Sequence, residues 1–188
     1  FPLEFKDEIT QPLSVFDYDK QRNYRFLITQ HKNLLMYDSK GKSVKGFNYL
    51  ATQAVSSQPK HFRVRGKDYI VFSAGNRLKL LDRRGSIRVE VRESINFSGA
   101  AIYLYKSLFT TTNTKGDLVQ VNTIGAVSRQ SLGLDPKHDI TCSSKTLVTR
   151  SENKLSIKSN PIDLEYGSYS PPNLFYLRDR IYISITDL

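Results

Sequence analysis

The feature that most constrains this chain is a unit of strands and turns that recurs at intervals of 40 to 47 residues. Its clearest marker is a turn in which Asp or Asn stands three positions before Gly. Three such turns end at Gly41, Gly85 and Gly125, which are 44 and 40 residues apart. Asp or Asn caps its own backbone in a turn of this kind, and Gly adopts the positive φ that the turn requires. The same local structure is therefore expected to form several times.

The apolar residues alternate as they do in strands, and no window shows helical spacing over three turns. The clearest apolar runs are Tyr24–Ile28, Tyr69–Ser73, Leu108–Thr111, Thr146–Thr149 and Ile181–Ile185. Turn residues follow each run closely, which indicates antiparallel hairpins. A four-stranded antiparallel unit that repeats at this interval predicts an all-β fold, a β-propeller of four-stranded antiparallel blades.

A β-sandwich or barrel with regular strand spacing is the alternative fold. Recurrence in register favours the propeller, because Gln11-Pro12 returns 47 residues later as Gln58-Pro59. We expect a single domain over residues 1–188 with about five blades. Four are complete, and one is a composite of a strand near 1–5 and two C-terminal strands. A fragment of a larger propeller is the alternative, since the chain starts at a residue other than Met and is expected to be trimmed or excised.

Two stretches, Phe16–Phe47 and Pro59–Asp82, carry a resemblance to known proteins. A strand that ends in Asp-x-x-Gly is similar to the repeats of quinoprotein-like and WD-repeat-like propellers. The chain also resembles the propeller-like C-terminal region of large, uncharacterised bacterial envelope proteins. This resemblance implies a periplasmic or cell-envelope location, with a cytoplasmic one left open, and it specifies no chemistry. Some of those proteins bear a ribonuclease H type II label, which does not suit a chain without an Asp-Glu-Ala-Gly-like strand end.

The positive charge is concentrated in one stretch. The chain has 28 Lys+Arg and 18 Asp+Glu, a net charge of +10. Residues 60–93 hold ten Lys/Arg and four Asp/Glu, a net +6. Because alternate strand residues share a face, one blade is expected to present a basic surface for nucleic acid, anionic lipid or acidic polysaccharide. The alternative is a solvated set of charges that protects outer strands. The candidate residues are Arg63, Arg65, Lys67, Arg77, Lys79, Arg83, Arg84 and Arg88.

One loop has oxygen-bearing side chains at alternating positions: Asp17, Asp19, Gln21 and Asn23. Such a loop can wrap a hard cation such as Ca²⁺, and it resembles the calcium loop of integrin-type propeller repeats. It departs from that pattern because Gln21 replaces a third Asp and two cationic residues interrupt it. It also occurs only once. A hydrogen-bonded hairpin turn is therefore the favoured interpretation, and we predict neither a metal nor a cofactor.

Other catalytic patterns are weak. The three histidines fall in different units, and the single Cys142 excludes a disulfide within the chain and is expected to be a buried thiol. The lack of Trp argues against a quinone-dependent dehydrogenase, and no Gly-x-Ser-x-Gly or phosphate-binding Gly loop is present. Tyrosines are densest towards the C-terminal half. We expect them either to pack between blades or to form a sugar- or peptide-binding face; they are Tyr103, Tyr105, Tyr166, Tyr169 and Tyr176.

The sequence thus predicts a non-catalytic interaction or scaffold domain of a larger bacterial envelope-associated protein, with a protein or glycan partner. The alternatives are a carbohydrate-active or other hydrolytic propeller with an axial site, and a binder of anionic polymers through residues 60–93. No apolar stretch approaches the roughly 20 residues of a membrane-spanning helix. A monomer is expected, or a dimer if the propeller is incomplete.

Overall fold

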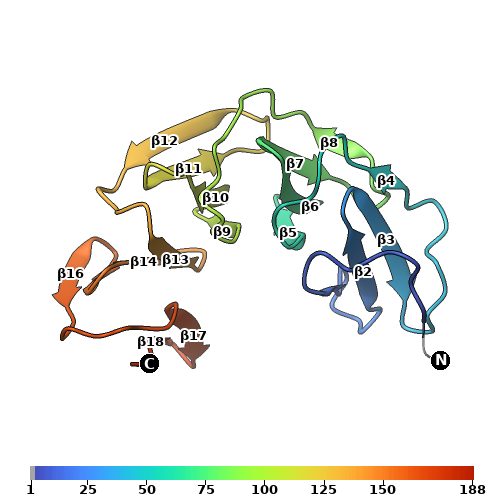
Figure 1. The fold of residues 1–188 in the computed structure, drawn as a ribbon. Helices are drawn as coiled ribbons and strands as arrows, with labels where there is room; N and C mark the ends of the chain where they lie inside the picture. Colours follow the sequence, from blue (N-terminus) through green and yellow to red (C-terminus); the bar gives the residue numbers. More distant parts are fainter. Residues whose placement is uncertain (1–2) are drawn as a thin grey trace. The chain divides into compact units, whose positions relative to one another are not determined.

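The computed structural model describes residues 3–188, and within them it contains 18 strands and no helix. The all-β prediction is therefore confirmed. Figure 1 follows the strands along the chain, from β2 in blue to β18 in red. The first sheet consists of β1 (Ser14–Phe16), β2 (Arg25–Gln30), β3 (Asn33–Asp38) and β4 (Tyr49–Leu50). The second consists of β5 (Lys60–Val64), β6 (Lys67–Ala74), β7 (Arg77–Leu81) and β8 (Ile87–Val89).

The third and fourth sheets repeat this antiparallel order. The third consists of β9 (Tyr103–Tyr105), β10 (Leu108–Thr112), β11 (Asp117–Val121) and β12 (Val127–Ser131). The fourth consists of β13 (His138–Cys142), β14 (Leu147–Ser151), β15 (Lys154–Ile157) and β16 (Asn160–Asp163). Each complete sheet is a meander of consecutive strands, as a propeller blade requires.

The chain divides into two compact units. Unit 1 comprises the residues up to Ile95 together with Thr123–Gly125, and it holds the first two sheets. Unit 2 comprises Asn96–Asn122 and Ala126–Leu188, and it holds the remaining sheets. The single domain over residues 1–188 stays a prediction.

The recurring turn has the predicted chemistry. The Asp82 carboxylate accepts hydrogen bonds from the backbone N–H groups of Arg84 at 2.8 Å and Ser86 at 3.0 Å. Gly85 has a φ of 81°, and a Cβ there would lie 3.1 Å from the backbone oxygen of Asn48. Glycine is therefore needed both for the left-handed backbone and for the close approach of the neighbouring segment.

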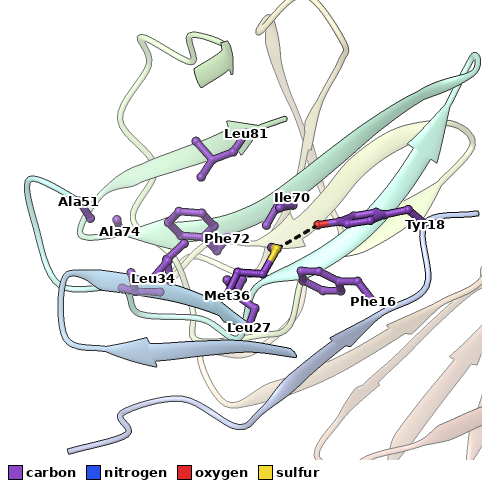
Figure 2. Close-up of a cluster of buried hydrophobic side chains, with 11 residues drawn as sticks. Phe16, Tyr18, Leu27, Leu34, Met36, Ala51, Ile70, Phe72, Ala74 and Leu81 are labelled. Carbon is purple, nitrogen blue, oxygen red and sulfur yellow. Dashed lines mark hydrogen bonds between the residues drawn. The ribbon is translucent and has the colours of Figure 1, made fainter. Parts of the chain in front are cut away.

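The core of unit 1 lies between its two sheets. Leu27 and Met36 are paired across β2 and β3, and Ile70 and Leu81 are paired across β6 and β7. Figure 2 shows these side chains gathered in one buried cluster with Phe72. Burying a side chain of this size stabilises the fold by roughly 1.5–3 kcal/mol, so this cluster is the main apolar contribution to unit 1.

The recurring Gln-Pro pair joins the segments that precede the first strands of these two sheets. The Gln11 side-chain amide donates to the backbone oxygen of Val55 at 3.3 Å. The Gln58 amide donates to the backbone oxygen of Leu13 at 3.0 Å. Each glutamine therefore links its own segment to the one leading into the other sheet, which explains why the pair recurs in register.

The fifth sheet has two strands, β17 (Asn173–Leu177) and β18 (Arg180–Ser184). The closure of this sheet by an N-terminal strand stays a prediction. Residues 3–13 contain no strand and instead contact the first sheet, where the Thr10 N–H donates to the Thr29 oxygen at 2.9 Å. Phe1 and Pro2 lie outside the described residues. About five blades is therefore the correct description, and two strands of the fifth lie within residues 3–188.

Candidate functional site: a basic edge on unit 1

One edge of unit 1 collects the loops that follow β1, β3, β5 and β7. Successive strands run antiparallel, so these loops lie at the same end of their sheets. They are 17–24, 38–42, 65–66 and 82–86. Contacts link them across the two sheets: the Arg83 guanidinium binds Asp19 at 2.8 Å, and the Asn48 N–H donates to the Arg84 oxygen at 3.4 Å. We call these loops, with the flanking Arg63, Lys67 and Asp68, the basic edge.

The carboxylates of this edge are occupied by internal contacts. Asp17 accepts from the backbone N–H groups of Gln21 at 3.2 Å and Arg22 at 3.0 Å. Asp38 and Asp82 cap the recurring turns. The backbone N–H groups that Asp38 accepts, that of Lys42 foremost, lower the pKa of its carboxyl below the usual 3.8. These acids therefore stabilise the loops through their hydrogen bonds.

Asp68 is the centre of a buried ionic network. It is only 8% exposed, and its two oxygens lie 2.8 Å from His61 Nε2 and 2.7 Å from Arg83 Nε. Arg63 lies further away, at 3.9 Å. Burial by itself raises the pKa of Asp68, but hydrogen bonding and charge from His61 and Arg83 outweigh it, and the pKa is lowered from 3.8. The arginine also binds Asp19 in the loop after β1, and this second ion pair joins the second sheet to the first.

Tyr18 forms the apolar floor of this network. The Arg83 guanidinium carbon lies 4.6 Å from the Tyr18 ring centroid, within the range of a cation–π contact. The His61 ring meets the Tyr18 ring edge-on at 4.8 Å. Burial raises the pKa of the Tyr18 hydroxyl, which contacts the Met36 sulfur at 3.9 Å. Arg83 and His61 are therefore held by the Tyr18 ring as well as by Asp68.

The cations that remain at this edge point into solvent. Among the described residues of the basic edge, seven exposed cationic side chains have no ion-pair partner: Lys20, Arg22, Lys40, Lys42, Arg65, Lys67 and Arg84. Since the carboxylates of the edge are held in turns and ion pairs, these seven exposed cations are the charged groups that remain available to a partner. It can attract several negative groups of an extended ligand at once.

The structure divides the predicted basic set. Arg63, Arg65, Lys67, Arg83 and Arg84 belong to the basic edge. Arg77 and Lys79 pair with Ala74 and Phe72 and share the sheet face that packs on the first sheet. Arg88 lies on β8 with its guanidinium 5.4 Å from the centroid of the Tyr69 ring. The predicted set is therefore not one surface.

Sequence reasoning missed four members of the edge, namely Lys20, Arg22, Lys40 and Lys42. A signal for two of them was available, because Lys40 and Lys42 stand in the same recurring turn as Arg84. Lys20 and Arg22 lacked such a signal, since the loop that holds them occurs once. Only the packing of the two sheets brings their loops to the same edge as Arg65 and Lys67.

The candidate cation loop is held by its own hydrogen bonds. Both Asp17 oxygens accept backbone N–H groups, and Asp19 is paired with Arg83. Gln21 and Asn23 are exposed. Across residues 3–188, no group of three or more His, Cys, Asp or Glu side chains is arranged to hold a metal ion. The loop therefore serves the contact between the sheets.

The axial-enzyme alternative requires a carboxylate with a histidine beside a hollow. His61 and Asp68 are such a pair, and a groove of about 320 Å³ between β1 and β5 is lined in part by His61. However, the second Asp68 oxygen is bound to Arg83, and the His61 ring is packed against Phe16 and Tyr18 at 5.9 and 4.8 Å. This environment holds the pair as a structural link.

The remaining sequence candidates lie apart. In unit 2, His138 contacts the Asp135 oxygen and the Thr112 hydroxyl, both at 2.7 Å. Cys142 ends β13 and is half-buried, so it is less buried than expected. Of the five tyrosines, Tyr103 and Tyr105 are half-buried on β9, and the Tyr169 hydroxyl donates to the Glu165 oxygen at 2.7 Å. Tyr166 and Tyr176 are exposed, so the five do not share one environment.

Comparison with known proteins identifies the fold. No protein-family model and no curated protein matches the chain. BBS1N, solved in complex with ARL6DN, is similar with a TM-score of 0.60 and 11% identity, over 94% of this chain and 60% of that one. BamB from Moraxella catarrhalis is similar with a TM-score of 0.60 and 15% identity, over 96% and 59%. The computationally designed Ika4 protein gives 0.57 and 12%, over 86% and 94%.

These similarities show the propeller fold and, at such low identity, the fold alone. The chain spans about 60% of the BBS1N and BamB chains that it matches. Within residues 3–188, no helix is long and apolar enough to span a membrane. The predicted propeller-like repeat is therefore confirmed, while the resemblance to envelope proteins stays a prediction.

Proposed function

We propose that this chain is a non-catalytic interaction module of propeller type, and that it binds an anionic polymer or an acidic partner surface through the basic edge of unit 1. The observation that carries the proposal is the separation of charge at this edge. Its carboxylates cap turns or form ion pairs, whereas seven cationic side chains among its described residues are exposed without ion-pair partners.

The fold supports a binding role, since propellers expose many short loops at the ends of their sheets. Among the similar structures, BBS1N was solved in complex with ARL6DN, which supports a protein partner as one form of the acidic surface. Membership of a larger bacterial envelope-associated protein is part of the same proposal. It is supported by the resemblance of Phe16–Phe47 and Pro59–Asp82 and is tested by fractionating cells that express the whole gene.

The proposal that the chain is non-catalytic rests on the environment of the His61–Asp68 pair. Asp68 holds Arg83, which also binds Asp19 of the first sheet, and this ionic network gives the pair a structural role. A broad screen with glycoside and ester substrates is expected to give no turnover. Turnover that disappears in His61→Gln while the variant stays folded would establish the hydrolytic alternative.

The binding test uses a fluorescent heparin oligosaccharide as the probe, with neutral dextran as the reference. Retention should be strong at low salt and should fall steeply as salt rises. The edge variant is the triple substitution Arg65→Gln, Lys67→Gln and Arg84→Gln. Each lost anion contact should lower the slope of log affinity against log salt by roughly 0.7–0.9.

The matched control removes three exposed cations of unit 2, through Lys137→Gln, Lys145→Gln and Lys158→Gln. Both triple variants have the same net charge. Equal weakening in the two would show that only net charge matters and would contradict a site at the basic edge. Lack of heparin binding by the unaltered chain at low salt would overturn the anionic partner altogether.

A further inference from the structure

A hollow of about 410 Å³ lies within unit 2, on one face of the fourth sheet. It is bounded by β14 and β15 on one side and by residues 132–135, which lead from β12 to β13, on the other. We call it the unit 2 hollow. His138 and Ser151 are paired and therefore share this face of the sheet, and His138 contacts Thr112 of β10 at 2.7 Å. The hollow therefore lies on the face of the fourth sheet that is turned towards the third.

The second sheet shows how the repeat fills the same place in unit 1. Phe72 pairs with Lys79, and Thr149 pairs with Ser156, in each case two residues beyond the pair that flanks the hairpin turn. Phe72 is fully buried and meets the ring of Tyr49 edge-on at 5.6 Å. Thr149 and Ser156 instead line the unit 2 hollow. A small side chain with a hydroxyl group therefore lies in unit 2 where an aromatic ring lies in unit 1.

Three hydroxyl groups that line the hollow are available to a ligand. Within residues 3–188, the hydroxyls of Thr149, Ser156 and Ser159 have no hydrogen-bond partner in the protein. Thr149 is only 6% exposed, and a buried polar group without a partner costs free energy unless water or a ligand binds it. Each hydroxyl can both donate and accept a hydrogen bond. Together they suit a ligand that itself carries several hydroxyl groups.

The rest of the lining favours a neutral ligand with an apolar face. Hydrocarbon is contributed by Leu132, Leu134 and Leu147. Glu152 and Lys154 also line the hollow, and their opposite charges give it no preference for an anion or a cation. Apolar surface with a few convergent polar groups is the usual composition of a site for a small molecule. The unit 2 hollow thus differs in kind from the basic edge, which selects for negative charge.

The wall formed by residues 132–135 is held in place by two contacts. The Asp135 N–H donates to the Ser151 hydroxyl at 3.0 Å, and this hydroxyl donates to the Asp135 carboxylate at 2.6 Å. The backbone oxygen of Leu134 packs on Gly116, where a Cβ would lie only 2.2 Å from it. The hollow is therefore formed before a ligand enters, which reduces the entropy that binding must offset.

We propose that the unit 2 hollow binds a neutral carbohydrate of one or two sugar rings. A sugar ring carries hydroxyl groups that donate and accept around an apolar C–H face, and the lining offers both kinds of contact. The volume lies at the lower end of the about 300–1,000 Å³ of small-molecule sites, which suits a ligand of this size. This site lies in a different unit from the basic edge, so the inference goes beyond the function proposed above and is tested apart from it.

The test is saturation-transfer-difference NMR on the full chain with three neutral disaccharides, namely maltose, lactose and N,N′-diacetylchitobiose. Glycerol is the reference, because it carries hydroxyl groups but has no ring. We expect at least one disaccharide to bind with a dissociation constant on the order of 0.1–1 mM, since a small uncharged ligand makes few strong contacts. The triple variant of the basic edge should bind this disaccharide as the unaltered chain does, so the two proposals can fail separately.

Two variants with matched controls locate the binding. Thr149→Val keeps the shape of the side chain but removes its hydroxyl, and should weaken binding about tenfold because a sugar hydroxyl loses its partner. Ser156→Leu places an apolar side chain in the hollow and should abolish binding. The controls are Thr146→Val, at a buried threonine whose hydroxyl also has no partner, and Ser128→Leu on the exposed strand β12. Neither control residue lines the hollow.

Binding of a disaccharide that both hollow variants weaken and both controls retain supports the proposal. Lack of binding by all three disaccharides overturns it, and so does saturation transfer to glycerol of equal strength. Binding that the hollow variants leave unchanged, or that the controls weaken equally, also overturns it. Circular dichroism establishes that each variant is folded, and the shape-preserving Thr149→Val decides the outcome if Ser156→Leu disturbs the sheet.

Discussion

The hairpins β6–β7 of unit 1 and β14–β15 of unit 2 have the same register but different interiors. Ala74 pairs with Arg77, and Ser151 pairs with Lys154, each across a two-residue turn. Phe72 and Thr149 therefore stand at equivalent positions, and both are buried. One is a large aromatic residue and the other a small residue with a hydroxyl. The repeat thus determines strand pairing, whereas the side chains determine how strongly each unit is stabilised.

Unit 2 buries many hydroxyl groups where unit 1 buries hydrocarbon. Its buried threonines are Thr110, Thr111, Thr112, Thr141, Thr146 and Thr149. Several accept or donate within the unit: the Thr110 hydroxyl donates to the Leu108 oxygen at 3.0 Å, and the Thr111 hydroxyl to the Ala100 oxygen at 3.2 Å. A hydrogen bond in a folded protein contributes about 1 kcal/mol net, less than a buried large apolar side chain. Unit 2 should therefore be the less stable unit.

The largest effect is expected from truncation at the matched position. Phe72 is 0% exposed and meets the Tyr49 ring edge-on at 5.6 Å, so Phe72→Ala should lower the free energy of unfolding by about 3–5 kcal/mol. Thr149→Ala should lower it by only about 1 kcal/mol. Urea unfolding followed by circular dichroism measures both. Losses of equal size would contradict the difference between the two interiors.

The next effect concerns the ionic network of unit 1. Asp68→Asn keeps the shape of the side chain but removes the charge that Arg83 binds, and should cost about 2 kcal/mol at neutral pH. The pKa of Asp68 is lowered in the folded state from 3.8. Its stabilising contribution is therefore present above that pH and is lost as the pH falls through 3.8 and below.

The measurement is the difference in unfolding free energy between the unaltered chain and Asp68→Asn as a function of pH. This difference should shrink as the solution is acidified. Asp163→Asn, at an exposed position on β16, is the control and should show little difference at any pH. A difference that stays constant on acidification would mean that Asp68 acts through shape rather than charge.

Sequence could predict the features that local rules govern. The recurring turn, its Asp82 cap and its Gly85 follow from four consecutive residues, and the strands follow from alternation. The ion pair between Arg83 and Asp19 could not be predicted, because its partners are 64 residues apart and meet only when two sheets pack. Arg77 was misplaced for the same reason, since one strand alone does not reveal which of its faces another sheet covers.

The smallest effects are expected at a serine that occurs before the first strand of a sheet in both units. In unit 1 the Ser56 hydroxyl lies 2.8 Å from the Ser73 hydroxyl. In unit 2 the Ser98 hydroxyl lies 2.8 Å from the Thr112 hydroxyl and also accepts from the Ala100 N–H at 3.2 Å. Ser98 thus makes one more contact than its counterpart.

Removing the hydroxyl should therefore cost more in unit 2. We expect about 0.5 kcal/mol for Ser56→Ala and about 1–1.5 kcal/mol for Ser98→Ala, because the second change also leaves the Ala100 N–H without its acceptor. Thr112 keeps its contact with His138 Nε2 at 2.7 Å in the Ser98→Ala variant, which limits the loss. Hydrogen exchange of β6 and β10 amides measures the two effects within their own sheets. A larger loss in β6 would reverse the conclusion that hydroxyl networks contribute more to unit 2 than to unit 1.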